Sequence, residues 1–297
     1  MTLPIIKLRN VWFAVSGALV AASIAILFIY PLKFGIDFTG GSLMEVEFKG
    51  DRPAPSAVSA DVSELGLGES VAQTVGDKEM LLRLKTLDEP THQKVLKSLD
   101  GKFGGVIEHR FESVGPTVGD ELRKKAAWSI ALVLLGIALY VSYAFRKVSR
   151  PVASWKYGLV TLIVGIMHDV LLPVAAFALL GHFALAEANS SFVAAILTVL
   201  GFSVHDTIVV FDRIRENLLR SGGAFEEIVE RSVNETLSRS INTSLAACLP
   251  LIAIYIWGGE SLKYFAFTLI IGLVAGTYSS IFLASPLLVV MQKKNSR

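Results

Sequence analysis

Six long apolar stretches constrain this chain more than any other feature of its sequence. They cover residues 11–30, 126–145, 157–180, 192–211, 242–257 and 264–290. An α-helix of about 20 apolar residues spans the hydrocarbon core of a bilayer. The composition agrees, because only 18% of the 297 residues are charged, whereas soluble proteins carry about a quarter. We therefore expect an α-helical membrane protein with six transmembrane helices, the first of them an uncleaved anchor.

The positions of lysine and arginine predict how these helices are oriented. Positive side chains are enriched in the cytoplasmic loops of membrane proteins. Lysine and arginine occur before the first stretch, in the connections between the second and third and between the fourth and fifth stretches, and at the C-terminus. The connection 181–191 has neither residue, and the connection 258–263 has one lysine. We therefore expect both termini in the cytoplasm and residues 31–125 outside it.

The segment between the first two helices has the patterns of a folded α+β domain. Strand-like alternation covers residues 42–48, 71–75, 80–84 and 106–114, and helical patterns cover residues 54–65 and 90–99. Pro90 suits the first turn of the second helix, and Gly101 suits its end. The order β-α-β-β-α-β predicts a ferredoxin-like domain. We divide the chain accordingly into residues 1–33 with the first helix, an extracytoplasmic domain at 34–122, and helices two to six at 123–297.

Composition and motifs disfavour several classes of function. The net charge of +2 is too small to indicate a nucleic-acid partner, and the single cysteine, Cys248, excludes an internal disulfide. The sequence has no glycine-rich phosphate loop and no recognisable hydrolytic triad. Its histidines and carboxylates show no spaced cluster of metal ligands. We therefore expect no enzymatic activity, no cofactor and no bound metal.

Three motifs resemble those of a known family. The first is FGIDFTGG at residues 34–41, directly after the first helix. The second is GFSVHDTIVVFDRIREN at residues 201–217, and the third is NETLSRSINTS at residues 234–244. Their sequences, their order and the six helices resemble the SecF branch of the SecD/SecF protein-export family, which is similar to half of an RND-type transporter. The likeness covers essentially the whole chain.

The resemblance implies a function in protein export. A SecF-like chain is expected to pair with SecD beside the SecYEG channel in the bacterial cytoplasmic (inner) membrane. There it would use the proton motive force to promote translocation of an unfolded preprotein. One alternative is half of an RND-type small-molecule or lipid exporter, which predicts a duplicated chain with two large outer loops. The other is a non-transporting scaffold of the translocon, in which buried ionisable residues would matter only for folding and assembly.

Asp206 and Arg239 are the candidate residues for proton transfer. An ionisable group deep in an apolar helix is costly, so Asp206 in the fourth helix is expected to be functional. Exclusion of water favours the neutral carboxyl, which would let Asp206 bind and release protons at physiological pH. The resemblance implies that Arg239 works with this aspartate, and its approach would drive proton release. The alternatives are a structural aspartate and an arginine that reaches lipid phosphates.

A second His-Asp pair, His168-Asp169 in the third helix, repeats His205-Asp206. His205 stands where the family often has asparagine. Asp169 shares a helix face with other small or polar residues, which suits a position inside the bundle. Asp169 could be a second proton-relay group or a structural hydrogen-bonding anchor, and the sequence favours neither role over the other. His168 and His205 could each shuttle protons, and the alternative for both is packing.

Several glycines predict turns and close helix contacts. Gly40 and Gly41 follow the first helix, and their conformational freedom predicts a hinge or turn between membrane and domain. Gly272 and Gly276 form a stripe of small residues in the sixth helix, which predicts close packing against a helix of this chain or of SecD. Gly165 has the same expected role in the third helix.

Overall fold

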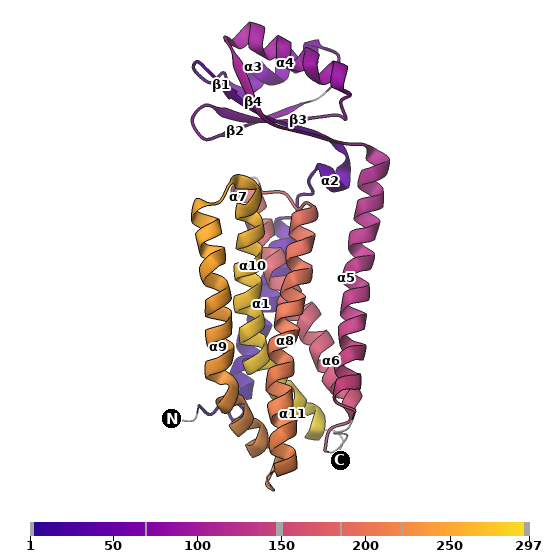
Figure 1. The fold of residues 1–297 in the computed structure, drawn as a ribbon, viewed down its shortest axis with the longest axis vertical. Helices are drawn as coiled ribbons and strands as arrows, with labels where there is room; N and C mark the ends of the chain where they lie inside the picture. Colours follow the sequence, from indigo (N-terminus) through magenta and orange to yellow (C-terminus); the bar gives the residue numbers. More distant parts are fainter. Residues whose placement is uncertain (1–2, 69, 147–150, 185, 221, 294–297) are drawn as a thin grey trace. The chain divides into compact units, whose positions relative to one another are not determined.

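A computed structural model describes residues 3–68, 70–146, 151–184, 186–220 and 222–293 of the chain (Figure 1). The chain divides into two compact units. One, which we call the membrane unit, consists of Met1–Lys33 and Trp128–Arg297. The other, which we call the sheet domain, consists of Phe34–Ala127. Helix α5 (Pro116–Ala144) runs from the sheet domain into the membrane unit.

Six helical spans in the described residues are long and apolar enough to cross a membrane, which confirms the predicted number. Four are continuous helices, namely α1 (Arg9–Ile29), α5, α8 (Ser190–Arg220) and α9 (Phe225–Trp257). The third span joins α6 (Ser154–Val164), the π-helical segment η1 (Gly165–Val170) and α7 (Leu171–Phe183). The sixth joins α10 (Glu260–Ser279), the π-helical segment η2 (Ser280–Ala284) and α11 (Ser285–Lys293).

The spans differ in how much of their surface packs inside the membrane unit. Within their apolar windows, 44%, 44% and 56% of the third, fourth and sixth spans is buried. The corresponding shares of the first, second and fifth spans are 11%, 6% and 11%. α8 contacts both α9 and α10 (Figure 1). Large side chains such as Tyr157 and Phe211 fill the core of the membrane unit. α1, α5 and α9 therefore leave most of their apolar surface for lipid or for another protein.

The helices of the fourth and fifth spans are longer than predicted. α8 continues to Arg220 and α9 begins at Phe225, whereas the apolar stretches cover 192–211 and 242–257. The apolar pattern ends where the polar part of each helix begins, but backbone hydrogen bonding continues through it. The two π-helical segments were not predicted either. One extra residue in a helical turn leaves no mark in the hydrophobic pattern, although such turns are frequent at functional sites.

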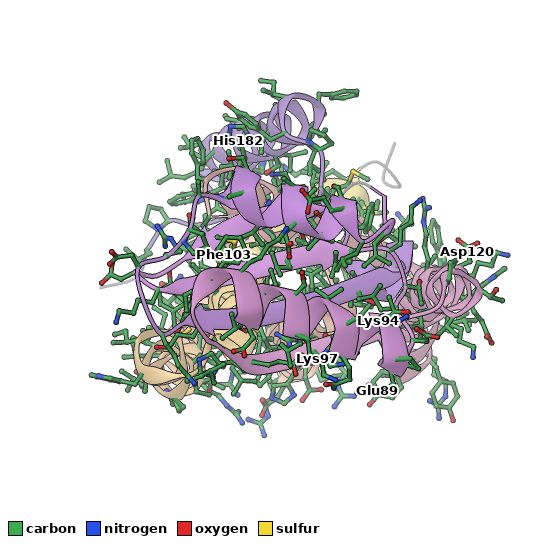
Figure 2. All side chains as sticks on the ribbon, turned by 90° about the horizontal axis from the view of Figure 1, so that it is seen from above. Glu89, Lys94, Lys97, Phe103, Asp120 and His182 are labelled. Carbon is green, nitrogen blue, oxygen red and sulfur yellow. The ribbon has the colours of Figure 1, made fainter. Side chains whose placement is uncertain are left out.

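The sheet domain has the predicted ferredoxin-like order. Its elements are α2 (Ile36–Thr39), β1 (Gly41–Phe48), α3 (Pro55–Glu64), β2 (Val71–Val75), β3 (Glu79–Leu84), α4 (Glu89–Phe103) and β4 (Val106–Val114). The strands form one antiparallel sheet in the order β2-β3-β1-β4. α3 and α4 lie together on one face of it (Figure 1). Figure 2 shows the outer side of α4, where Lys94 and Lys97 are exposed.

Alternation along β1 separates the two faces of the sheet. Met44, Val46 and Phe48 are fully buried and pack with apolar side chains of α3 and α4. Glu45 and Glu47 lie between them in sequence and are only partly buried. Because successive side chains of a strand point to opposite faces, these two glutamates lie on the face away from the helices. We call this the open face of the sheet.

Local chemistry sets the limits of α4. The Asp88 carboxylate accepts a hydrogen bond from the backbone N–H of Thr91 (3.1 Å), and Pro90 occupies the first turn as predicted. Hydrogen bonds from the side chain of Thr91 and then from its backbone N–H lower the pKa of Asp88. The predicted end at Gly101 is wrong, because the helix continues to a C-cap at Gly104. Gly104 has φ 78°, a left-handed conformation that glycine adopts without strain.

Candidate functional site

Asp206 lies in α8 and contacts α9. Its Oδ1 accepts a hydrogen bond of 2.6 Å from the Ser240 hydroxyl of α9. Its Oδ2 is buried and has no hydrogen-bond partner among the described residues. A buried polar atom without a partner is uncommon in folded proteins and calls for a functional or solvent explanation. Asp206 is thus a carboxyl group with one fixed oxygen and one available oxygen.

Asp206 lines a small cavity between three helices. The cavity has a volume of about 20 Å³ and is lined by Phe202, Ser203, His205, Asp206, Thr243, Ser244, Leu273 and Thr277. A water molecule needs roughly 10–15 Å³ and two to four polar partners. The cavity therefore has room for about one water, and hydroxyl groups of α8, α9 and α10 line it. Such a water would give Asp206 an acceptor or donor for its proton.

Further hydroxyl groups link the helices around this cavity. The Ser244 hydroxyl of α9 hydrogen-bonds the Thr277 hydroxyl of α10. The Thr207 hydroxyl of α8 hydrogen-bonds the Ser280 hydroxyl at the start of η2 (2.9 Å). Hydrogen bonds of this kind between helices hold polar groups inside a membrane bundle. Asp206 consequently lies near hydroxyl groups that can both donate and accept hydrogen bonds.

The second His-Asp pair lies in η1 and is more deeply buried. His168 is 0% exposed and Asp169 is 1% exposed. Both Asp169 oxygens have partners, because Ser203 of α8 donates to one and His168 Nδ1 lies 3.1 Å from the other. His168 stacks on Tyr278, and its Nε2 has no partner among the described residues. The structure therefore places Asp169 inside the bundle with partners for both of its carboxylate oxygens.

Arg239 and His205 lie on exposed parts of their helices. Arg239 directly precedes Ser240 in α9, and Ser240 is the α9 residue that hydrogen-bonds Asp206. His205 directly precedes Asp206 and lines the small cavity. The arrangement brings His205 to the site and leaves Arg239 one residue away from the hydrogen-bonded contact.

Polar side chains join α8 to α9 beyond the apolar part of both helices. Arg213 contacts Glu235 at 2.6 Å and Glu216 at 2.5 Å. Asn217 donates hydrogen bonds of 2.9 Å to Ser232 and to Glu235. These residues come from the second and third sequence motifs and from the start of α9. The two motifs therefore meet in space and fix the relative position of the helices that carry Asp206 and Ser240.

The N-terminal segment is also attached to α9. The Glu230 carboxylate accepts hydrogen bonds from the backbone N–H groups of Ile5 (2.5 Å) and Ile6 (3.0 Å). Asn234 forms two hydrogen bonds with the backbone of Leu3, one to its N–H (2.7 Å) and one to its carbonyl (2.9 Å). The start of α1 is thus bound to the helix that carries Ser240.

The glycines of the sixth span lie against α8. A Cβ atom at Gly276 would come within 2.8 Å of the Ser203 Cβ, and one at Gly272 would overlap the Val199 side chain. The helix that packs closely against these glycines is therefore α8, a helix of the same chain. At Gly165 a Cβ atom would lie 3.6 Å from the nearest leucine side chain, which is ordinary van der Waals contact.

Gly40 and Gly41 lead from α2 into β1 with φ of 72° and 124°. A Cβ atom at Gly40 would approach the Pro116 backbone to 2.8 Å, and one at Gly41 would approach the Leu84 carbonyl oxygen to 2.9 Å. Both conformations are unfavourable for residues with a side chain. Glycine is therefore required here by backbone geometry and by close packing inside the sheet domain.

Several residues of the site were not found from the sequence. Ser240, Ser203, Thr277 and Ser244 were overlooked because hydroxyl residues are tolerated anywhere in an apolar helix. These hydroxyl residues lie on neighbouring helices at the same depth as Asp206 and Asp169. That shared depth is the one feature of the sequence that could have identified them. Glu230 was overlooked because it lies outside the apolar stretches.

Comparison with known families agrees with this arrangement. Residues 94–294 match the family described as protein export membrane protein SecD/SecF, C-terminal, and residues 25–51 match the SecD/SecF GG motif. The protein translocase subunit SecF of Thermobaculum terrenum is 41% identical over 98% of this chain and 94% of its own length. The corresponding protein of Anaerolinea thermophila is 38% identical over 98% and 94%.

Solved structures of similar proteins extend the comparison to the fold. The crystal structure of SecDF, a translocon-associated membrane protein from Thermus thermophilus, matches with a TM-score of 0.83 and 30% identity over 99% of this chain. SecDF in a super-membrane-facing form matches with a TM-score of 0.69 and the same identity. In each case this chain spans 39% of the length of the SecDF chain.

Proposed function

Because this chain belongs to the SecD/SecF family of protein-export membrane proteins, we propose that it works as a proton-driven export subunit. In this proposal it binds a SecD protein and acts beside the SecYEG channel in the bacterial cytoplasmic membrane. Both termini lie in the cytoplasm, and the sheet domain lies outside, where it meets the emerging preprotein. The lysine and arginine distribution supports this orientation.

Two observations support a SecD partner. The similar SecDF chains are much longer, and this chain matches 39% of their length, so the SecDF fold contains further parts that the matched region does not supply. In addition, α5 and α9 have only 6% and 11% of their apolar windows buried. Next to the cavity, Phe202 is 45% exposed and His205 is exposed. A helix bundle that packs on this side would enclose Asp206.

The unpartnered Oδ2 of Asp206 is the observation that carries the proton-transfer proposal. A proton bound at this oxygen neutralises the carboxyl group, while the Ser240 hydroxyl holds the other oxygen. A water in the cavity passes the proton to or from Oδ2, with His205 at the cavity wall. Each proton that crosses the membrane potential releases about 2.3 kcal/mol per 100 mV.

Arg239 couples this protonation to movement of α9. When Asp206 loses its proton, the negative charge attracts the guanidinium group, which stabilises the charged carboxylate. When Asp206 is protonated, the attraction disappears and α9 is free to return. Arg239 and Ser240 are adjacent in α9 and point about 100° apart, so a rotation of this helix about its axis exchanges one contact for the other.

His168-Asp169 has a different role in this proposal. Both oxygens of Asp169 already have partners, which supports the structural anchor rather than the second relay. His168 then serves to orient Asp169 through Nδ1. Gly40 and Gly41 are the turn through which movement of the membrane helices reaches the sheet domain.

Replacement of Asp206 by asparagine tests the proposal. Membrane vesicles that contain the complete complex should export a preprotein normally without a proton gradient and lose the stimulation that the gradient provides. Asp212→Asn is the matched control, because its side chain is 53% exposed and pairs with Arg215 at the end of α8. The amount of assembled complex is measured for both variants. Full gradient-dependent stimulation in the Asp206 variant would remove Asp206 from the mechanism, and a loss of assembly would favour the scaffold alternative.

A further inference from the structure

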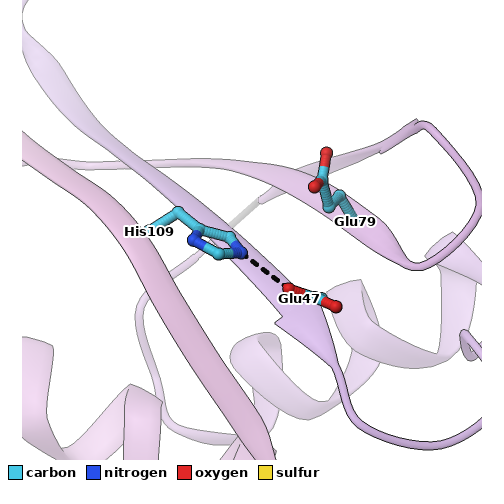
Figure 3. A group of neighbouring side chains, drawn as sticks. All are labelled: Glu47, Glu79 and His109. Carbon is cyan, nitrogen blue, oxygen red and sulfur yellow. Dashed lines mark hydrogen bonds and ion pairs between the residues drawn. The ribbon is translucent and has the colours of Figure 1, made fainter.

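Three side chains on the open face of the sheet domain lie close together (Figure 3). They are Glu47 of β1, Glu79 of β3 and His109 of β4. One ligand atom from each, an imidazole nitrogen or a carboxylate oxygen, lies within 4.8 Å of the other two. His109 Nε2 is 2.8 Å from an oxygen of Glu47. Three strands that are rigidly hydrogen-bonded to one another therefore supply the group.

The register of the sheet puts two negative charges in direct opposition. Glu47 and Glu79 are paired residues of β1 and β3. Like charges directly opposite each other on neighbouring strands destabilise a sheet. A cation between the two carboxylates converts this repulsion into attraction. The pairing of these two glutamates therefore indicates a binding site for a cation.

A β-bulge brings the histidine to the same place. In the pairing of β1 with β4, Glu45 is opposite Arg110 and Val46 is opposite Glu108, so His109 is the extra residue. A bulge of this type re-aims a side chain and is often found beside functional sites. Here it adds an imidazole to the open face, close to Glu47. The sequence alternation alone does not predict that position.

A second group of one histidine and two glutamates in the same domain shows a different geometry. His92 has Glu89 at 3.3 Å from Nδ1 and Glu108 at 2.6 Å from Nε2. The two carboxylates thus lie on opposite sides of a buried imidazole, where they cannot share one ion with it. In the group on the open face, by contrast, one ligand atom from each of the three side chains lies within 4.8 Å of the other two, so all three can reach a single ion.

We propose that Glu47, Glu79 and His109 bind a divalent transition-metal ion of the zinc class. Imidazole and carboxylate together suit zinc, which bonds nitrogen and oxygen at about 2.0–2.2 Å. Ligand atoms on a tetrahedral ion with such bonds are about 3.4 Å apart. Rotation of these partly exposed side chains is enough to reach that spacing from 4.8 Å. The three protein ligands leave a fourth position for water or for a ligand from another protein.

Zinc titration of the full-length protein in detergent tests this site. Binding is measured by competition with a chromophoric zinc chelator, and thermal unfolding is recorded with and without zinc. We expect one tight zinc per chain and a rise in the unfolding temperature on zinc addition. His109→Ala and Glu79→Gln should each weaken binding by at least about tenfold and abolish the rise in temperature.

Two control variants separate a metal site from general attraction. Glu45→Gln removes a charge from the same face of β1, and His182→Ala removes an exposed histidine that belongs to no such group among the described residues. Both should bind zinc like the parent protein. Equal zinc affinity in the parent and in both ligand variants would overturn the proposal. So would equal weakening by Glu45→Gln, which would indicate non-specific electrostatic binding.

Discussion

His168-Asp169 and His205-Asp206 place the same two residue types in two regions of the membrane unit. In η1 the histidine and the aspartate are both fully buried, and both aspartate oxygens have partners. In α8 the histidine is exposed, and one aspartate oxygen is buried without a partner among the described residues. A dipeptide therefore does not determine a role. The neighbouring helices do, because they decide which oxygen remains available for a proton.

The largest difference between the two His-Asp pairs is expected in proton-stimulated export. We expect Asp206→Asn to reduce proton-stimulated export by at least about tenfold, because proton transfer at the available oxygen is lost. Asp169→Asn should change it by less than about twofold, since the amide can still accept a hydrogen bond from Ser203. Preprotein translocation into vesicles measures both. An equal loss in the two variants would mean that both carboxyl groups carry protons.

The free energy of unfolding should depend more on Asp169 than on Asp206, which is the reverse of the order expected for export. Asp169→Leu leaves the buried hydroxyl of Ser203 and the buried His168 without their partner, at a cost of about 2–4 kcal/mol. Asp206→Leu removes a single hydrogen-bond partner, that of Ser240, which can turn to a backbone carbonyl of its own helix. We expect a cost below about 1 kcal/mol there. Denaturant unfolding of the purified protein compares the two, and a reversed order would contradict the assignment of Asp169 as an anchor.

Helix packing provides a third distinction. Gly276→Ala should destabilise the contact between α10 and α8 by about 1–3 kcal/mol, because the added methyl group meets the Ser203 Cβ at 2.8 Å. Gly165→Ala in η1 should be tolerated, since its methyl group has ordinary contact distances. Thermal unfolding of the two variants measures the difference. Similar losses would show that η1 needs its glycine for a reason other than space.

Ser240→Ala should reduce export less than Asp206→Asn does. It removes the hydrogen bond to Oδ1 of Asp206 and leaves the carboxyl group in place, which is worth about 1 kcal/mol. Proton-stimulated export should therefore fall by about fivefold. Ser238→Ala on the exposed side of α9 is the control and should export normally. An unchanged rate in the Ser240 variant would show that this hydroxyl does not position Asp206.

The elements that could be predicted are those fixed by one-dimensional patterns. Helix length identified the six spans, and alternation identified the four strands. Asp206 and Asp169 stood out because ionisable residues are rare in apolar helices. The difference between them could not be predicted, since it depends on Ser240 and Ser203 from other helices. The open-face group escaped for the same reason, because three strands and one bulge assemble it.

The attachment of the N-terminal segment to α9 has a mechanical consequence. Glu230 and Asn234 hold the backbone before α1, ten and six residues ahead of Ser240 on the same helix. α1 is one continuous helix, and residues 30–33 connect its far end to the sheet domain. If α9 shifts on proton release as proposed, it would therefore pull on a helix rather than on a loop. That helix would carry the movement across the membrane toward the sheet domain.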